Sequence, residues 1–464
     1  MVNISQSKSN AVKKAAFHNL GCKVNSYELD LIRQEFLENG FLEADFDDEA
    51  DVYVVNTCTV TGIAGKKSRQ MLRRARRRNP DAVVIAVGCY VETEPEAMEE
   101  GRIADLLIGS RQKLKTFDIY REYMEGIQQP AGEEEAPFPE HGKVLSRPER
   151  TRADIKVQDG CDRFCTYCII PYARGRITSR PAEDVTAELA ALTAAGIREA
   201  VLSGIHIGSY GADMGLDPRR ALTDLIRACA AVDGIDRVRI GSIEPVFADR
   251  ETVRELSGIR ELCPHFHLSL QSGCDRTLRR MNRRYTAAQY RESAGFLREY
   301  FDRPALTTDV IVGFPGETEE DFEESLAFVE ETGFYMVHVF KYSKRKGTPA
   351  ASYPDQVPEE VKNKRSDILL DLTARQALAY REQFAGEEAL IYPEQIFTAG
   401  GKAYCTGHTE RYLEVCAPLL GDAELSGELP ESMTGRLILP AGTVLEDLRG
   451  ADAGGMLLLE RAET

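Results

Sequence analysis

Three cysteines stand within eight residues, in the run Cys161-Asp162-Arg163-Phe164-Cys165-Thr166-Tyr167-Cys168. Their spacing is Cys-x3-Cys-x2-Cys, and no fourth cysteine or histidine follows nearby. Cysteine thiolates hold iron–sulfur clusters, and a four-iron cluster held by three of them keeps one iron open. An open metal position is typical of a catalytic site rather than a structural one. We therefore predict a [4Fe–4S] cluster that takes part in a reaction.

Three simpler interpretations of this triplet fit less well. A structural zinc site takes four ligands, usually from two Cys-x2-Cys pairs, and a second pair is missing. A disulfide would leave one of the three cysteines over, and the sequence opens without an apolar export segment. A ferredoxin-like electron carrier normally has a fourth cysteine in the run. The three-ligand cluster is favoured, and zinc is the main alternative.

A second set of cysteines, Cys22, Cys58 and Cys89, shares a context although its members lie far apart. Each falls one or two residues beyond a predicted parallel strand, and strand carboxyl ends gather along one edge of an open α/β sheet, where ligands bind. Gly21 and Gly88 precede two of them and allow a bulky ligand close to the backbone. We predict a second three-ligand cluster here. The alternative is three small buried core residues.

The other five cysteines share no context and are expected to fill the core: Cys229, Cys263, Cys274, Cys405 and Cys416. In the run Cys263-Pro264-His265-Phe266-His267, a strand would turn both histidines to one face. The ligand count nevertheless falls short of a zinc site.

Basic residues are unevenly distributed in a chain whose formal net charge is −17. That charge argues against non-specific nucleic-acid binding by the whole surface, but between residues 66 and 78 lie eight basic residues and no acidic ones. Unbalanced clusters of this kind indicate a polyanionic partner, and a solvated helix face is the alternative. The predicted phosphate contacts are Lys66, Lys67, Arg69, Arg73, Arg74, Arg77, Arg283, Arg284, Lys344 and Arg345.

The elements that must position these residues predict an α/β protein of several domains. Strand and helix patterns alternate over residues 1–128, as in an open parallel sheet, and an acidic, proline-rich linker follows at 129–150. About six β/α units over 151–382 predict a partial barrel with its active-site loops at the strand carboxyl ends. Short strands and glycine-rich turns over 383–450 predict a small all-β module, followed by a tail at 451–464.

The motifs resemble those of the radical S-adenosylmethionine methylthiotransferases over nearly the whole chain. Residues 161–172 match the radical motif of that family, residues 21–28 and 56–61 resemble its amino-terminal signatures, and Gly407-His408-Thr409-Glu410 lies in a module similar to the RNA-binding TRAM domain. Residues 57–61, 67–69, 203–208 and 342–348 resemble the branch that modifies N6-threonylcarbamoyladenosine beside the tRNA anticodon. The branches acting on isopentenyladenosine in tRNA or on a ribosomal protein are the alternatives.

The resemblance implies two [4Fe–4S] clusters, with S-adenosylmethionine as a further cofactor. The first cluster would be held by Cys161, Cys165 and Cys168, and the second by Cys22, Cys58 and Cys89. It implies that the first cluster cleaves S-adenosylmethionine to a radical, while the second carries the sulfur that becomes methylated. The residues expected to line the cofactor are Tyr167, Ser203, Gly204, Glu244, Ser269 and Gln271. Tyr167 could instead pack the loop, and Glu244 and Asp309 could equally be structural groups.

The implied partners are a tRNA anticodon stem-loop, a flavodoxin- or ferredoxin-type electron donor and an unidentified sulfur donor. We expect a reducing cytoplasm as the location, because the sequence has no export signal and no run long enough to span a bilayer. A monomer is a separate expectation. A non-catalytic iron–sulfur RNA-binding protein is the alternative from another class.

Overall fold

The protein is described from a computed structural model over residues 12–99, 103–127, 151–399, 402–419, 429–438 and 457–460. The chain divides into two compact units, Met1–Leu145 with Cys168–Arg176, and Ser146–Tyr167 with Ile177–Thr464. The expected linker at 129–150 lies outside the described residues. Across the described ranges, each helix is either too short or too polar to cross a membrane.

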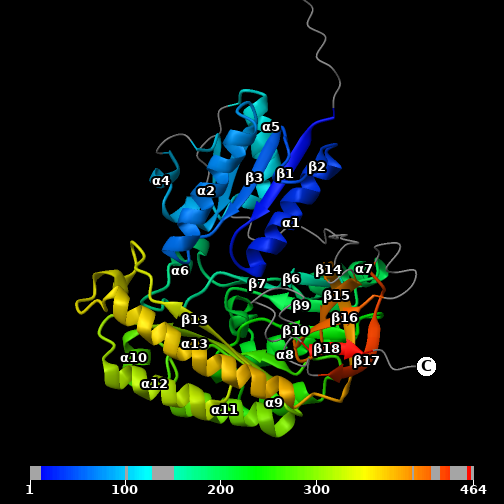
Figure 1. Ribbon diagram of the computed structural model, residues 1–464. Coiled ribbons are helices and arrows are strands. Elements are labelled where there is room, and N and C mark those ends of the chain that lie inside the picture. The colour runs from blue at the N-terminus through cyan, green and yellow to red at the C-terminus, as the bar shows by residue number, and fades with distance from the viewer. Residues whose placement is uncertain are drawn as a thin grey trace, which may run out of the picture. The chain divides into compact units, whose positions relative to one another are not determined.

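The first unit is a five-stranded parallel sheet with helices on both faces (Figure 1). The strand order is β2-β1-β3-β4-β5, which confirms the predicted open sheet. Its elements are β1 (Lys14–Asn19), α1 (Lys23–Glu38), β2 (Leu42–Ala44), β3 (Val52–Thr57), α2 (Gly62–Arg78), β4 (Val83–Gly88), α3 (Cys89–Thr93), α4 (Glu96–Glu99), β5 (Leu106–Ile108), α5 (Thr116–Met124) and α6 (Ile170–Arg174).

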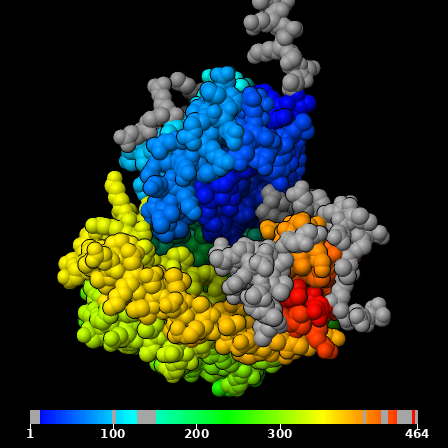
Figure 2. Space-filling model, in the orientation of Figure 1, coloured from blue at the N-terminus to red at the C-terminus, as the bar shows by residue number. Residues whose placement is uncertain are grey.

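Alternation along the central strands gives this sheet two separate cores. Tyr53 and Val55 of β3 pack in the cluster that contains Leu72 of α2, whereas Val52 and Val54 pack in the cluster that contains residues of α1 and α5. Successive side chains of a strand point to opposite faces, so a continuous apolar run is needed when both faces are covered. All six residues of β3 are buried inside the unit, whose outer atoms are blue in Figure 2.

The second unit contains six parallel strands in two sheets, β6-β9-β10 and β11-β12-β13. The sheets continue into each other, because Ile243 and Leu268 form a parallel bridge and the Ile243 N–H donates to the His267 carbonyl over 3.0 Å. This is the predicted partial barrel. The elements are β6 (Arg152–Lys156), β7 (Gln158–Asp159), β8 (Thr178–Ser179), α7 (Ala182–Ala194), β9 (Glu199–Ser203), α8 (Pro218–Ala230), β10 (Arg237–Ile240), α9 (Arg250–Ser257), β11 (His265–His267), α10 (Asp275–Arg280), α11 (Ala287–Tyr300), β12 (Ala305–Val312), α12 (Glu319–Thr332), β13 (Met336–Lys341) and α13 (Glu359–Glu382).

The carboxyl-terminal module is a closed barrel of order β14-β15-β16-β18-β17. Its strands are β14 (Glu388–Ala399), β15 (Lys402–His408), β16 (Glu414–Pro418), β17 (Met433–Ile438) and β18 (Leu457–Glu460). The expected boundary at residue 450 is corrected here, since β18 lies in the supposed tail and pairs with β16 and β17. Leu457 and Leu459 are completely buried, because their alternation points both side chains into the barrel.

Buried charges join this module to the partial barrel. Glu199 of β9 pairs with Arg239 of β10 over 2.6 Å, and both side chains are buried. The same guanidinium donates to the Thr409 carbonyl over 2.6 Å, and Arg237 donates to the Leu390 carbonyl over 2.7 Å. Burial alone would raise the pKa of Glu199, but the Arg239, Arg237 and Arg152 guanidinium groups hold it below its ordinary value.

Candidate active site

The loop of the first cysteine triplet follows β7. Cys161 is half-buried and Cys165 is buried. Phe164, between them, has a φ of 48°, a left-handed conformation that is costly for a residue with a side chain. The Asn282 amide stabilises it by donating to the carbonyl oxygens of Arg163 over 3.3 Å and Phe164 over 3.1 Å. Residues outside the loop therefore fix its shape.

Nitrogen donors point at both of these thiols. Arg283 Nη1 donates to Cys165 Sγ over 3.2 Å, and the Arg163 backbone N–H donates to Cys161 Sγ over 3.5 Å. Hydrogen bonds to ligand sulfurs are one way in which a protein sets the potential of an iron–sulfur cluster. Burial raises the pKa of the Cys161 thiol to about 11. A metal that binds there must displace a proton, which couples metal binding to pH.

Glu244 connects the residues around this loop. Its carboxylate lies 2.8 Å from Arg163, 3.1 Å from Arg283 and 3.1 Å from His206 Nε2. Burial alone would raise the pKa of Glu244, but the His206 hydrogen bond and the Arg283 and Arg163 charges hold it at about 2. Glu244 is therefore ionised and orders the two arginines that donate to the cysteine sulfurs. The structural role that the sequence left open for Glu244 is therefore to position Arg163, Arg283 and His206.

The other predicted cofactor residues lie at strand ends. The buried Ser203 hydroxyl donates to the Ile155 carbonyl over 3.2 Å, and a Cβ at Gly204 would lie 2.8 Å from Gln158 Oε1. Gln271 is buried with a φ of 67°, and its N–H donates to the Asp309 carbonyl over 2.8 Å. Left-handed backbone at a non-glycine residue is concentrated at functional sites.

Two of the predicted cofactor residues have structural partners. The Ser269 carbonyl accepts a hydrogen bond of 2.8 Å from the Tyr285 hydroxyl. Tyr167 packs edge-to-face on Phe314 at a ring-centroid distance of 6.5 Å, beside the buried Met281. Packing of the loop accounts for the Tyr167 position, and its cofactor contact stays a prediction.

The second cysteine set comes together in the first unit. Cys58 directly follows β3, Cys89 directly follows β4, and Cys22 precedes the first turn of α1. A Cβ at Gly21, whose φ is +114°, would lie 3.2 Å from Cys58 Sγ, so only glycine permits this approach. Burial, with smaller contributions from the nearby Cys89 and Cys22 thiols, raises the pKa of Cys58 to about 11. Cys22 is exposed, so the set opens to the surface of the unit.

A buried amide network fixes the backbone beside these cysteines. The Asn25 side chain donates to the Leu20 carbonyl over 2.8 Å and to the Thr57 carbonyl over 3.2 Å. The Asn56 side chain in turn donates to the Asn25 carbonyl over 2.7 Å. Since Leu20 precedes Cys22 by two residues and Thr57 directly precedes Cys58, Asn25 holds the ends of two strands in register at the thiol site.

Buried charges extend this network to the segment after Cys168. Glu28 of α1 is completely buried and accepts two hydrogen bonds of 3.1 Å from Arg174, which also donates to the Asn25 side chain. Lys113 forms a further ion pair with Glu28. A two-point guanidinium–carboxylate contact fixes orientation as well as distance. Six residues after Cys168, Arg174 is therefore held by α1, the helix that directly follows Cys22.

Two family models match separate stretches of this chain. Residues 155–329 match the Radical SAM superfamily, and residues 14–109 match a family described as uncharacterized protein family UPF0004. A Bacillus subtilis protein named threonylcarbamoyladenosine tRNA methylthiotransferase MtaB is 42% identical, over 86% of this chain and 89% of its own. The Aquifex aeolicus protein of the same name is 38% identical, over 82% and 93%. The chain belongs to the radical S-adenosylmethionine methylthiotransferase family.

The fold of this methylthiotransferase is also found in a more distant solved structure. The radical S-adenosylmethionine methyltransferase TsrM from Kitasatospora setae, solved with cobalamin and a [4Fe–4S] cluster bound, has a TM-score of 0.56 at 17% identity. The match covers 74% of this chain and 77% of that one. At this identity the likeness supports the fold alone.

The first cysteine triplet fits the cofactors that radical S-adenosylmethionine enzymes use, a [4Fe–4S] cluster with S-adenosylmethionine. Three thiols within eight residues leave one iron for the cofactor. The donors from Arg163 and Arg283 suit sulfurs that carry negative charge. The remaining five cysteines are buried, as expected of core residues.

The basic residues of the methylthiotransferase fall into two groups. Predicted phosphate contacts with exposed side chains are Lys66, Lys67, Arg73, Arg77, Arg284 and Lys344. On α2 these lie opposite the buried face, which contains Ser68, Leu72 and Ala75. Arg69 bonds the Tyr90 hydroxyl and Arg74 pairs with Asp47, so both already have protein partners.

Two predicted RNA contacts are corrected. The Arg283 side chain is 7% exposed and serves Cys165 and Glu244, and Arg345 is likewise 7% exposed. Neither presents its charge to a polyanion at the surface. A run of basic residues in the sequence does not show which of them are exposed and which are buried. Burial depends on tertiary neighbours that are distant in sequence.

Sequence reasoning missed the residues that support the cysteines: Asn25, Glu28, Arg163, Arg174 and His206. A local signal existed in α1, where Asn25 and Glu28 follow Cys22 by three and six residues and lie on one face of the helix. The local sequence gave no signal for Arg174 or His206, because their partners are distant in sequence.

Proposed function

We propose that this chain adds a methylthio group to C2 of N6-threonylcarbamoyladenosine next to the anticodon of tRNA. The observation that carries the proposal is the convergence of Cys22, Cys58 and Cys89 at one sheet edge, in a chain whose other cysteine triplet belongs to a Radical SAM domain. Two of the relatives, at 42% and 38% identity, are named for this reaction.

We assign a second [4Fe–4S] cluster to Cys22, Cys58 and Cys89. The support is that the three thiols lie near enough to influence one another electrostatically, that one of them is exposed, and that a buried amide network fixes the backbone around them. When bound, the two clusters and S-adenosylmethionine supply the radical and the methylated sulfur. The chain itself holds the thiols at fixed positions and leaves one iron of each cluster open.

Around the first cluster, Glu244 pairs with the side chains of Arg163 and Arg283; the Arg283 guanidinium donates to Cys165 Sγ, and the Arg163 backbone N–H donates to Cys161 Sγ. Ser203, Gly204, Ser269, Gln271 and Tyr167 are proposed to line the S-adenosylmethionine site. Their supporting feature is their position after strands β9 and β11 and in the cysteine loop, where ligands of such barrels bind. The left-handed Gln271 fits a backbone shaped for contact with a ligand.

The exposed residues of α2 are proposed to bind the anticodon stem-loop. Lys66, Lys67, Arg73 and Arg77 form one solvent-facing stripe on the helix that begins four residues after Cys58. Phosphate contacts fix the position of an RNA without reading its sequence. The target base must be unstacked to reach the thiols, as single-stranded loops permit. An electron donor of the flavodoxin or ferredoxin type, a monomeric state and a cytoplasmic location complete the proposal.

The test uses the full chain with both clusters reconstituted, a chemical reductant, S-adenosylmethionine and three substrates. These are tRNA carrying N6-threonylcarbamoyladenosine, tRNA carrying isopentenyladenosine, and ribosomal protein. Nucleoside mass spectrometry should detect 2-methylthio product on the first substrate alone. Methylthiolation of either other substrate in its place would reassign the branch. Absence of S-adenosylmethionine cleavage in the reduced protein would favour a non-catalytic RNA-binding protein.

A further inference from the structure

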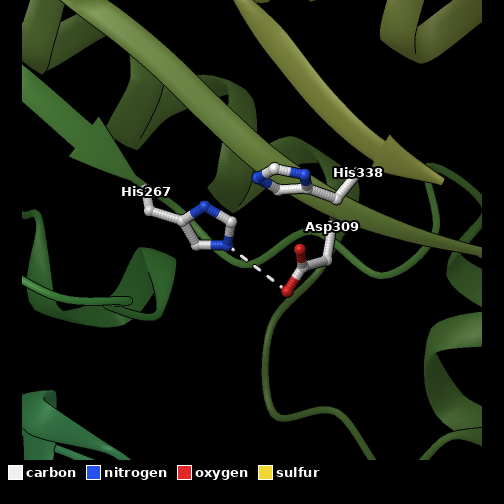
Figure 3. A group of neighbouring side chains, drawn as sticks. All are labelled: His267, Asp309 and His338. Atoms are coloured by element: carbon white, nitrogen blue, oxygen red, sulfur yellow. Dashed lines mark ion pairs between the residues drawn. The ribbon is translucent and has the colours of Figure 1, made fainter. Parts of the chain in front are cut away.

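Three potential metal ligands outside the cysteine sites lie on neighbouring strands of one sheet. They are His267 of β11, Asp309 of β12 and His338 of β13 (Figure 3). In the parallel register, His267 is opposite Thr307 and Asp309 is opposite His338. Since residues two apart on a strand share a face, all three side chains stand on the same face of the sheet. In the sequence, His265 and His267 together offered too few ligands, whereas the fold groups His267 with Asp309 and His338.

The spacing of the donor atoms suits a single ion. One donor atom from each residue lies within 4.8 Å of the other two. His267 Nε2 and Asp309 Oδ2 are 3.3 Å apart. Two ligands about 2.1 Å from a tetrahedral metal lie about 3.4 Å from each other. The existing pair therefore has the separation of two ligands around one ion, and a ring nitrogen of His338 lies within 4.8 Å of both.

The surroundings of His267 orient it as a ligand. Its Nδ1 lies 3.1 Å from Thr307 Oγ1, while Nε2 faces Asp309 (Figure 3). A histidine ligand commonly has its second ring nitrogen fixed by such a hydrogen bond, which sets both the tautomer and the ring direction. The His267 and His338 rings are nearly parallel, with centroids 5.9 Å apart and an interplanar angle of 28°.

Burial and charge are compatible with cation binding. The His267 side chain is 15% exposed and that of Asp309 is 29% exposed, whereas His338 is exposed and leaves a route for entry.

We propose that His267, Asp309 and His338 bind one divalent transition-metal ion of the zinc class. Two imidazoles and one carboxylate form a donor set that suits zinc, iron(II) and cobalt(II), and three protein ligands leave a coordination position for an oxygen ligand. The site contains no cysteine of either triplet, and it stands independently of the proposed function. The simpler arrangement, a His267–Asp309 ion pair beside an unrelated His338, is the alternative that the experiment must exclude.

The experiment uses the full chain with both clusters loaded and oxidised, the state in which [4Fe–4S] clusters are diamagnetic. The protein is dialysed against micromolar Co²⁺, and bound cobalt is measured by mass spectrometry and pulsed electron paramagnetic resonance. The variants are His338→Asn, whose exposed side chain makes misfolding a small concern, and Asp309→Asn. His265→Asn, two residues from His267 on the same strand face, is the matched control.

The proposal expects one equivalent of cobalt with imidazole-nitrogen modulation in the wild type and in His265→Asn. Both signals should be lost in His338→Asn and in Asp309→Asn. Retention of the cobalt and of its nitrogen modulation in the two variants would overturn the proposal. Cobalt whose absorption shows only thiolate-to-metal charge transfer would also overturn it, because the metal would then be held by cysteines.

Discussion

Replacing Glu28 with glutamine should destabilise the first unit strongly. The Glu28 carboxylate is completely buried between the side chains of Arg174 and Lys113, which are 1% and 2% exposed. Glutamine keeps the shape and one acceptor oxygen but removes the negative charge, so two buried cations lose the carboxylate between them. Breaking a buried ion pair from one side costs about 3–5 kcal/mol. The free energy of opening the sheet next to α1 should fall by that amount.

Native-state hydrogen exchange on the cluster-free chain measures this free energy at the strand concerned. The amides of β3 lie in the centre of the sheet, and their protection should fall about 10²–10⁴-fold in Glu28→Gln. Glu43→Gln is the matched control, because Glu43 pairs with Arg33 of the same helix but is 44% exposed. A surface pair contributes about 0–1 kcal/mol. A loss of protection below about tenfold in Glu28→Gln, or one equal to that of Glu43→Gln, would refute the reasoning.

Three further predictions concern other parts of the chain. Arg283→Met removes a positive donor from Cys165, so the cluster potential in a redox titration should become more negative, while Arg284→Met should leave it unchanged. Neutralising Lys66, Arg73 or Arg77 should lower the salt-dependence slope of tRNA binding by about 0.7–0.9 each, whereas Arg76→Gln, which breaks the pair with Asp105, should lower it less. Arginines hold the pKa of Glu199 below its ordinary 4.5, so its stabilisation is present above pH 4.5 and lost as the pH falls through the folded-state pKa. Thermal unfolding of Glu199→Gln should therefore show a flatter acid limb than the wild type, and an unchanged limb would contradict this.

The sequence was most informative where a local pattern determines the structure. Strands β3, β4 and β12 were predicted within one residue at each end, because strands covered on both faces are mostly apolar, although Thr307, Thr308 and Asp309 interrupt the apolar run of β12. The parallel arrangement then placed Cys58 and Cys89 at one edge. These two steps predicted the second thiol site before any side chain was placed.

Residues whose role depends on a distant partner were not predictable in this way. The run Arg283-Arg284 contains one buried arginine that contacts Cys165 and one exposed arginine, and nothing in the local sequence separates them. β18 was missed for a similar reason, since four residues with two buried leucines form a strand only when β16 and β17 are beside them. The His267, Asp309 and His338 group likewise exists only through strand register.

In the proposed function, the two cysteine triplets of this chain act together on one tRNA base. The most direct measurement is mass spectrometry of tRNA nucleosides from cells that lack the gene, complemented with the wild type or with Cys22→Ala. In the deletion, 2-methylthio-N6-threonylcarbamoyladenosine should disappear and N6-threonylcarbamoyladenosine should accumulate. The methylthiolated nucleoside should return with the wild-type gene and not with Cys22→Ala. Normal levels of the methylthiolated nucleoside in the deletion, or full restoration by Cys22→Ala, would contradict it.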